Sequence, residues 1–438
     1  MNVDSYLFFM FNIFWLIFPL LFLSFLLKPK VGIYLLAFLI PVIGWEISIA
    51  SFVFPFIDLV ALSLLLAFVI RLAYFSLFDP LKVPKLRLPL FLPFFLFLLV
   101  SFLSAIFSTE VSYSLWYFCR WPLFLYLAYI FLPYNLINDQ KTLKKTIIAA
   151  TISSIIVLIF GFLSLIGQDW RDSFFRLSSV SINGVFPFGA NHNLIAEFLN
   201  VGAFFVLALR LLVKDARTKR FFDIIFLFSV LGIILTFSRS AWIVLLLQIL
   251  SYLVIFLKDK KMEKKDFLFP LILIFLLISP LFLHMSRLQE NNVSSTENRV
   301  LLTEISLQAL KEKPVLGYGS GSFINLVDKN LRFKAKYGEA IDAHGFIQKT
   351  IAENGLLGFI AWTFIFLVIL KTFWQAIKKH GSSHYWLSPL ILGASGGLFF
   401  QLLNTSYYKG KVWLPIVLAL LAIKLLDNNY NKKNVRKD

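Results

Sequence analysis

The sequence predicts an all-α polytopic membrane protein with about twelve or thirteen transmembrane helices and one long loop outside the membrane. Hydrophobic residues make up 59% of the 438 residues, and the mean hydropathy is +0.80. Charged residues make up only 15%, against about 25% in soluble domains. Apolar windows of about 20 residues, enough to cross a hydrocarbon core of about 30 Å, recur along the whole chain.

In chain order, these windows predict thirteen helices, at about 6–27, 31–44, 54–77, 88–107, 116–133, 146–167, 194–213, 221–237, 240–257, 267–284, 355–374, 386–404 and 411–426. The segment 31–44 is short and contains Pro41, so a re-entrant or tilted segment there would leave twelve spans. We divide the chain into helices one to ten (1–284), the long loop with short helices (285–353), and the C-terminal helices with a tail (354–438).

The distribution of Lys and Arg predicts the orientation. The net charge is +18, but the cations gather in alternate short connections, which is typical of the cytoplasmic side of a membrane protein and not of a nucleic-acid-binding surface. Connections 45–53 and 108–115 contain neither Lys nor Arg. We therefore expect a cytoplasmic C-terminus and an outward-facing loop 285–353. The single cysteine, Cys119, excludes an intramolecular disulfide and a cysteine metal cluster.

Two outward turns carry polar residues next to apolar helices. Asn191-His192-Asn193 precedes a predicted helix, where an Asn side chain is a good N-cap; the free N–H groups of that helix end are alternatively suited to an anionic or glycan ligand. Ser238-Arg239-Ser240 joins two predicted helices. An arginine near the membrane is costly, so Arg239 either reaches the lipid headgroups or binds an anionic ligand with its neighbouring serines.

The long loop contains a further arginine and a run of glycines. Ser294-Ser-Thr-Glu297 resembles a capping box, and it predicts a helix up to about Glu312 with Arg299 in its first turn. A cation is unfavourable there because of the helix dipole, which suggests a functional role for Arg299. Gly317, Gly319 and Gly321 predict a tight turn with exposed backbone donors, which either folds the loop back onto the membrane or binds ligand.

His344 is the strongest single candidate for a catalytic residue. Taken alone, a histidine in a loop is more often structural than catalytic. Here it accompanies two outward arginines, and imidazole is the side chain whose ordinary pKa suits proton abstraction near neutral pH.

Five segments together resemble the O-antigen ligase and polymerase family. They are Phe237-Ser-Arg239-Ser-Ala-Trp242, Glu297-Asn-Arg299, Lys313-Pro-Val-Leu-Gly-Tyr-Gly-Ser-Gly-Ser-Phe323, Ala343-His344 and Glu353-Asn-Gly-Leu-Leu-Gly358. The resemblance covers about 185–375. One departure is Gly345, since family members commonly have Asn or Ser after the histidine, and this puts a secondary hydrogen bond in doubt.

The resemblance implies an inverting, metal-independent glycosyltransferase of the helical C-type, with no cofactor, in the bacterial inner membrane. Its donor would be a glycan on undecaprenyl pyrophosphate at the periplasmic leaflet. By similarity, Arg239 and Arg299 would bind the pyrophosphate, and His344 would position or deprotonate the acceptor hydroxyl. Further candidates for glycan or acceptor binding are Asn191, His192, Ser238, Tyr318 and Gly319.

Three functions remain open from the sequence. A ligase would transfer a finished polysaccharide to lipid A–core, whereas an O-antigen or exopolysaccharide polymerase would extend a lipid-linked glycan. A protein O-oligosaccharyltransferase would use the same donor. A transporter or flippase is a different class, but transporters place ionisable groups near the midplane in matched repeats. Here the candidate functional residues lie in the predicted outward connections, outside the membrane spans. Acidic residues within the predicted spans are few, among them Asp58 and Glu197.

Overall fold

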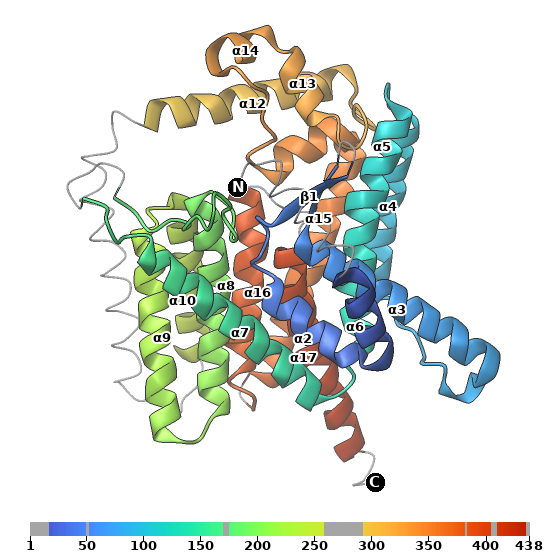
Figure 1. Ribbon diagram of the computed structural model, residues 1–438, viewed down its shortest axis with the longest axis vertical. Helices are drawn as coiled ribbons and strands as arrows, with labels where there is room; N and C mark the ends of the chain where they lie inside the picture. The colour runs from blue at the N-terminus through green and yellow to red at the C-terminus, as the bar shows by residue number, and fades with distance from the viewer. Residues whose placement is uncertain are drawn as a thin grey trace.

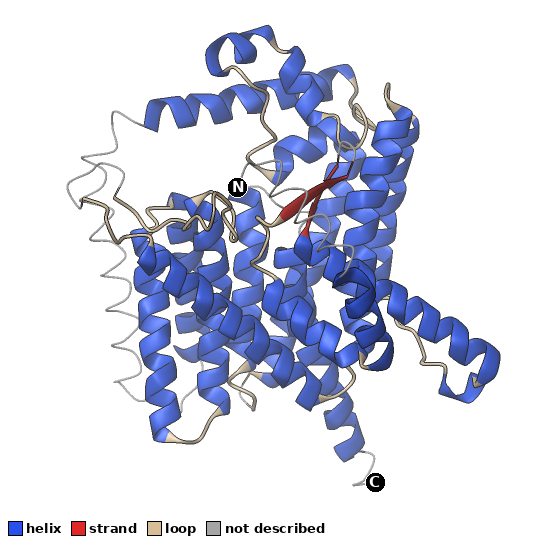
Figure 2. Ribbon diagram, in the orientation of Figure 1, coloured by secondary structure: helices blue, strands red, loops and turns tan. Residues whose placement is uncertain are grey.

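The protein is an all-α, multi-pass membrane protein in which a bundle of helices carries a helical cap at one end (Figure 1). The computed structural model describes residues 17–49, 52–169, 175–257, 292–381, 383–403 and 410–434. Helices dominate these ranges, and a single short hairpin is the paired sheet among them (Figure 2). We call residues 292–345 the cap, because its helices lie across the end of the bundle in Figure 1.

The bundle helices follow the predicted windows closely. They are α2 (Pro29–Leu39), α3 (Phe56–Phe78), α4 (Phe91–Ile106), α5 (Val111–Phe118), α6 (Leu132–Leu136), α7 (Gln140–Leu163), α8 (His192–Leu212), α9 (Ala216–Leu235), α10 (Arg239–Leu257), α15 (Phe346–His380), α16 (Leu387–Leu403) and α17 (Gly410–Asn434). Pro80–Lys82 forms a 3₁₀ turn after α3. The predicted helix at 267–284 and the first part of the one at 6–27 lie outside the described residues.

Five described helices are long and apolar enough to cross a membrane: Phe56–Phe78, Val111–Leu136, Gln140–Leu163, His192–Leu212 and Phe346–His380. Five more are apolar but shorter, at Ile17–Leu27, Pro29–Leu39, Phe91–Ile106, Arg239–Ile255 and Leu387–Leu402. The segment predicted at 31–44 is one of the short ones, since α2 ends at Leu39 before Pro41. Proline lacks the amide proton that a continuing helix would need.

The span Val111–Leu136 is a single rod whose hydrogen bonding changes along its length. Two π-helical stretches, Cys119–Leu123 and Tyr126–Phe131, separate α5 from α6. Pro122 lies inside the first stretch, where its missing N–H disturbs the regular ladder. The sequence predicted an uninterrupted helix at 116–133, so both the earlier start and the π-helical stretches are differences.

A short antiparallel hairpin precedes α3 and was not predicted. Strand β1 (Glu46–Ile49) pairs with β2 (Phe52–Pro55), with Glu46 opposite Pro55. It occupies the connection 45–53, which we had predicted to be a plain outward loop.

Close packing of α16 against α8 and α10 fixes the bundle beneath the cap. A Cβ at Gly393 would lie 3.0 Å from the carbonyl oxygen of Val201 on α8, and one at Gly396 would lie 2.1 Å from Nε2 of Gln248 on α10. Small residues let helix backbones approach closely, which is the usual source of helix association in a membrane. The middle of α10 is therefore held beside α16 and α8.

Two buried ion pairs lie within the bundle. The Arg120 Nη2 atom is 2.7 Å from an oxygen of Asp58 on α3, and Lys411 on α17 pairs with Glu197 on α8. All four side chains are less than a tenth exposed. The sequence analysis singled out both acids but neither cation, because a cationic partner far along the chain leaves no local signal.

The cap has a small apolar core of its own. Its helices are α12 (Asn292–Glu312), α13 (Phe323–Lys329) and α14 (Leu331–Tyr337), and Leu302, Phe323 and Phe333 are fully buried between them. The predicted helix 294–312 ends as expected before Pro314, but it begins at Asn292. Ser294 is therefore not its N-cap, and Arg299 lies two turns into the helix. The argument that the helix dipole disfavours Arg299 was wrong for this reason.

Candidate active site

The first element of the site is the turn that places Arg239 at the start of α10. Helix α9 ends at Leu235, and Phe237 takes a left-handed conformation with φ of 52°, which reverses the chain. The Ser238 hydroxyl donates a hydrogen bond of 2.6 Å to Oδ1 of Asn193 on α8. The Arg239 side chain is exposed at this turn.

The second element is the neighbouring start of α8. Asn191 is its N-cap, with Oδ1 accepting from the N–H of Asn193 at 2.8 Å, as predicted. The hydrogen bond from Ser238 to Asn193 joins the two turns directly. His192 opens the helix, and its partly buried imidazole lies near the guanidinium of Arg176. Of the predicted residues, Asn191, His192, Ser238 and Arg239 therefore share one neighbourhood.

The cap brings Arg299 to this neighbourhood. Burial, and then the positive charge of Arg239, lower the pKa of the Arg299 guanidinium below its ordinary value. Two residues 60 positions apart along the chain are thus close enough to repel one another. The Arg299 Nε atom is buried and has no hydrogen-bond partner among the described residues. A pair of like charges with unused donors is suited to an anion, especially one with several phosphate oxygens.

His344 completes the group, on the segment between α14 and α15. Burial and the nearby Arg299 charge lower the pKa of its imidazole, while Asp342 acts in the opposite direction. The side chain is partly buried. A lowered pKa leaves the ring neutral at pH 7, and only the neutral ring can accept a proton. Arg239, Arg299 and His344 therefore form one electrostatically coupled cluster, which we call the Arg–Arg–His cluster.

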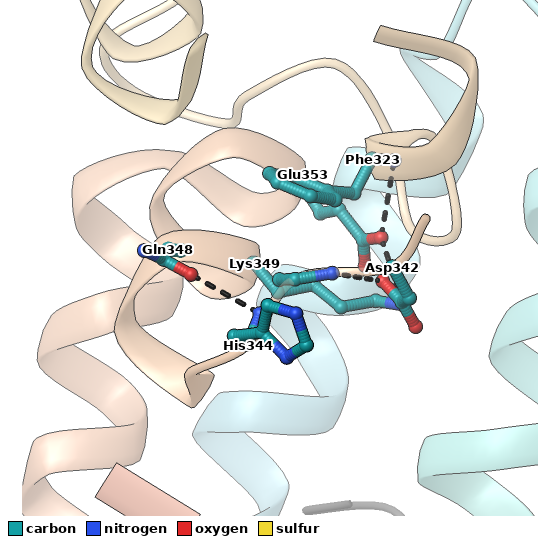
Figure 3. Close-up of polar contacts among 7 residues, drawn as sticks. Phe323, Asp342, His344, Gln348, Lys349 and Glu353 are labelled. Atoms are coloured by element: carbon teal, nitrogen blue, oxygen red, sulfur yellow. Dashed lines mark hydrogen bonds and ion pairs between the residues drawn. The ribbon is translucent and has the colours of Figure 1, made fainter. Parts of the chain in front are cut away.

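Gln348 links the two cap residues of this cluster, and the sequence analysis missed it. Its Oε1 accepts the backbone N–H of His344 at 3.2 Å (Figure 3). Its Nε2 donates to the carbonyl oxygen of Arg299 at 3.3 Å and to the Thr303 hydroxyl at 2.6 Å. One amide thus ties the His344 segment to α12. The signal in the sequence was the spacing of four residues, which lets Gln348, in the first turn of α15, reach back to residue 344.

A buried ion network supports the same segment (Figure 3). Lys349 Nζ lies 2.7 Å from an Asp342 oxygen and 3.5 Å from a Glu353 oxygen, and the Lys349 side chain is 3% exposed. Glu353 in turn accepts the backbone N–H of Phe323 at 3.2 Å. The network holds the chain on both sides of His344 to α15 and to the glycine-rich run.

The glycine-rich run packs onto α15 instead of presenting free donors. Tyr318 N–H donates to the Ala352 carbonyl oxygen at 3.0 Å, and Gly319 N–H donates to that of Glu353 at 2.9 Å. Gly319 is buried, and a Cβ there would lie 2.4 Å from the Ser108 side chain. The prediction of exposed backbone donors was therefore wrong at these positions. The alternative prediction, a turn that folds the loop back onto the bundle, describes the run.

The glycine-rich run packs against a sharp kink in α15. Gly355 has φ of 63° and ψ of −161° within an otherwise helical segment, a conformation that is essentially restricted to glycine. The N–H groups of Leu356 and Leu357 donate to the carbonyl oxygens of Pro314 and Val315. The kink divides α15 into two helices: the first begins at Phe346 with Gly345 as its N-cap and was not predicted, and the second follows Gly355, where the sequence predicted a helix. Gly345 has no side chain to cap the helix, as its departure from the family pattern implied.

The cluster can bind an anion and accept a proton. Its two guanidinium groups offer donors in planar arrays, and a neutral imidazole lies beside them. Over the ranges that the structure describes, no three His, Cys, Asp or Glu side chains gather in a way that could hold a metal ion.

The fold defines a helical, multi-pass membrane protein, and the Arg–Arg–His cluster lies where the cap meets the bundle. Residues 224–363 match the family model described as O-antigen ligase. The matched segment contains Arg239, Arg299 and His344, and it confirms the resemblance seen in the sequence. The match supports an enzyme of the O-antigen ligase or polymerase type. No curated protein matches the chain.

Proposed function

We propose that this protein is an O-antigen ligase, which transfers polysaccharide from undecaprenyl pyrophosphate to lipid A–core at the periplasmic face of the bacterial inner membrane. The Arg–Arg–His cluster carries the proposal. Besides burial, the charge of Arg239 lowers the pKa of Arg299, and the charge of Arg299 lowers the pKa of His344, although the three residues come from distant parts of the chain. The cation-poor connections at 45–53 and 108–115 support a periplasmic position for that end and a cytoplasmic C-terminus.

In the proposed reaction, the acceptor hydroxyl oxygen attacks the anomeric carbon of the donor sugar. The bond between that carbon and the pyrophosphate oxygen breaks, and the pyrophosphate leaves with the bonding electrons. Arg239 and Arg299 stabilise the negative charge that develops on the leaving group. Neutral His344 takes the hydroxyl proton. Attack opposite the leaving group inverts the anomeric configuration.

The test combines purified protein with lipid-linked glycan and one of two acceptors, lipid A–core or more lipid-linked glycan. Transfer to lipid A–core supports the ligase, whereas extension of the lipid-linked glycan alone identifies a polymerase. No glycosidic product with either acceptor would overturn both and leave a transporter or flippase.

Variants then test the residue roles. We expect His344→Ala and Arg299→Ala to abolish transfer without unfolding the protein, and Arg239→Lys to be badly impaired, because a point charge does not replace a planar guanidinium. Arg332→Ala is the matched control, since Arg332 is a cap arginine whose side chain is 75% exposed. Transfer at the wild-type rate by His344→Ala would refute the proposed base.

A further inference from the structure

A polar cavity lies between the cap and α5, and none of the residues of the Arg–Arg–His cluster lines it. It has a volume of about 300 Å³ and lies between α12, the start of α13 and the loop from Ser108 to the first turns of α5. This is at the lower end of the range for small-molecule sites. Along the axis of α12, its lining residues from Ile305 to Glu312 lie about 9 to 20 Å beyond Arg299.

The lining groups offer hydrogen-bond partners for hydroxyl groups. Asn325 Nδ2 donates to both carboxylate oxygens of Glu110, at 3.3 and 3.2 Å, and Gln308 donates to Glu312 at 3.0 Å. Each carboxylate keeps acceptor capacity beyond these bonds. Ser322 is one of the lining residues, and its buried hydroxyl oxygen has no hydrogen-bond partner within the described part of the chain. An unused buried hydroxyl is costly unless a ligand or water pairs with it.

The cavity also presents aromatic rings and a charge opposite to that of the cluster. Tyr113 and Tyr318 both line it, and their rings offer apolar faces beside polar groups. Its charged lining residues are Glu110, Glu312 and Lys329, so the lining is on balance acidic. Such a cavity disfavours a phosphate or a uronic acid. It suits an uncharged ring that carries many hydroxyl groups.

We propose that this cavity is a subsite for neutral sugar rings of the glycan, remote from the pyrophosphate. The inference rests on the proposed function, because it assumes that the glycan of the proposed substrate extends from the Arg–Arg–His cluster along α12. A separation of about 9 to 20 Å is longer than one sugar ring, so it requires an oligosaccharide. The subsite would therefore bind sugar units of the glycan that lie away from the glycosidic bond that reacts.

The test measures sugar binding directly, without the transfer reaction. Purified full-length protein in nanodiscs is mixed with methyl β-glucoside, methyl β-galactoside, N-acetylglucosamine or glucuronic acid, and saturation-transfer NMR reports binding. We expect at least one neutral sugar to bind and glucuronic acid to bind more weakly. Inorganic pyrophosphate should not displace the bound sugar. Absence of binding by every neutral sugar, or displacement by pyrophosphate, would overturn the proposal.

Three variants locate the binding. Gln308→Trp should fill the cavity and abolish the signal, whereas Leu307→Trp is the matched control, because Leu307 is 47% exposed on the same helix and outside the cavity. Ser322→Ala should weaken binding about fivefold, the loss of one hydrogen bond. Equal binding by wild type and Gln308→Trp would overturn the proposal.

The outcome is separable from that of the proposed function. Arg299→Ala should lose transfer and still bind sugar. If the protein binds neutral sugar in this cavity but forms no glycosidic product, the sugar subsite is supported and the proposed glycosyltransferase activity is refuted. A protein that transfers glycan and binds sugar equally well with Gln308→Trp would keep the transferase and refute the subsite.

Discussion

The amide of Gln348 gives the sharpest test of how the site is positioned. Gln348→Ala removes three hydrogen bonds, one each to the His344 N–H, the Arg299 carbonyl oxygen and the Thr303 hydroxyl. Each contributes about 0.5–1.5 kcal/mol, and each 1.4 kcal/mol corresponds to about a tenfold change in rate. A misplacement of about 1 Å near the reacting groups costs about a hundredfold. We therefore expect glycan transfer to slow by about 10- to 100-fold.

The assay is transfer from lipid-linked glycan by purified protein, followed across pH. Loosening His344 from Arg299 should let the pKa of the imidazole rise towards its ordinary value, so the acid limb of the profile should move to higher pH. The control is Ile347→Ala, because Ile347 is the neighbouring residue and is 43% exposed. A Gln348→Ala protein with the wild-type rate and an unchanged pH profile would refute the positioning role.

Three further predictions concern charge and backbone. Because burial and the Arg299 charge lower the pKa of His344 below 6.5, transfer should fall only as pH drops below that value; an acid limb above pH 6.5 would contradict a neutral base. Lys349→Met should destabilise the protein by about 1.5–3 kcal/mol, the range for a lost hydrogen bond to a charged group, since Asp342 loses its cationic partner at 2.7 Å; an unchanged midpoint of thermal unfolding, followed by tryptophan fluorescence, would show the pair to be dispensable. Gly355→Ala should reduce the yield of folded protein in size-exclusion chromatography, because its Cβ would lie 2.4 Å from a backbone carbonyl oxygen at positive φ; a normal yield would mean that the kink can relax.

The local elements of the site were predictable because their signals are local. The sequence predicted Asn191 or Asn193 as a helix cap from the side chain and the apolar run that follows, and the structure has Asn191 as the cap. Arg239 was placed in a turn because two apolar windows meet there. Arg299 stays a predicted site residue, but the reason from the helix dipole was wrong, since α12 begins at Asn292, three residues before the first helical residue that the capping box implied.

The supporting contacts were not predictable, because each joins residues that are distant in the sequence or depends on backbone shape. Gln348 meets Arg299 across 49 positions, and Arg120 meets Asp58 across 62. The sequence predicted that the glycine-rich run exposes its backbone donors. Nothing near the run in the sequence shows that the carbonyl oxygens of Ala352 and Glu353, just before the Gly355 kink, accept hydrogen bonds from it.

The sequence by itself determined the class of protein and the residue types available for chemistry. Hydropathy is a property of short windows, and a lipid environment accepts few alternatives to a helix whose backbone is fully hydrogen-bonded. Only the tertiary structure decided which charges meet. The repulsion between Arg239 and Arg299, the bridge through Gln348 and the acidic sugar-sized cavity all arise where the cap folds across the bundle. Electrostatic interactions and packing depend on distance in space, and distance along the chain does not encode it.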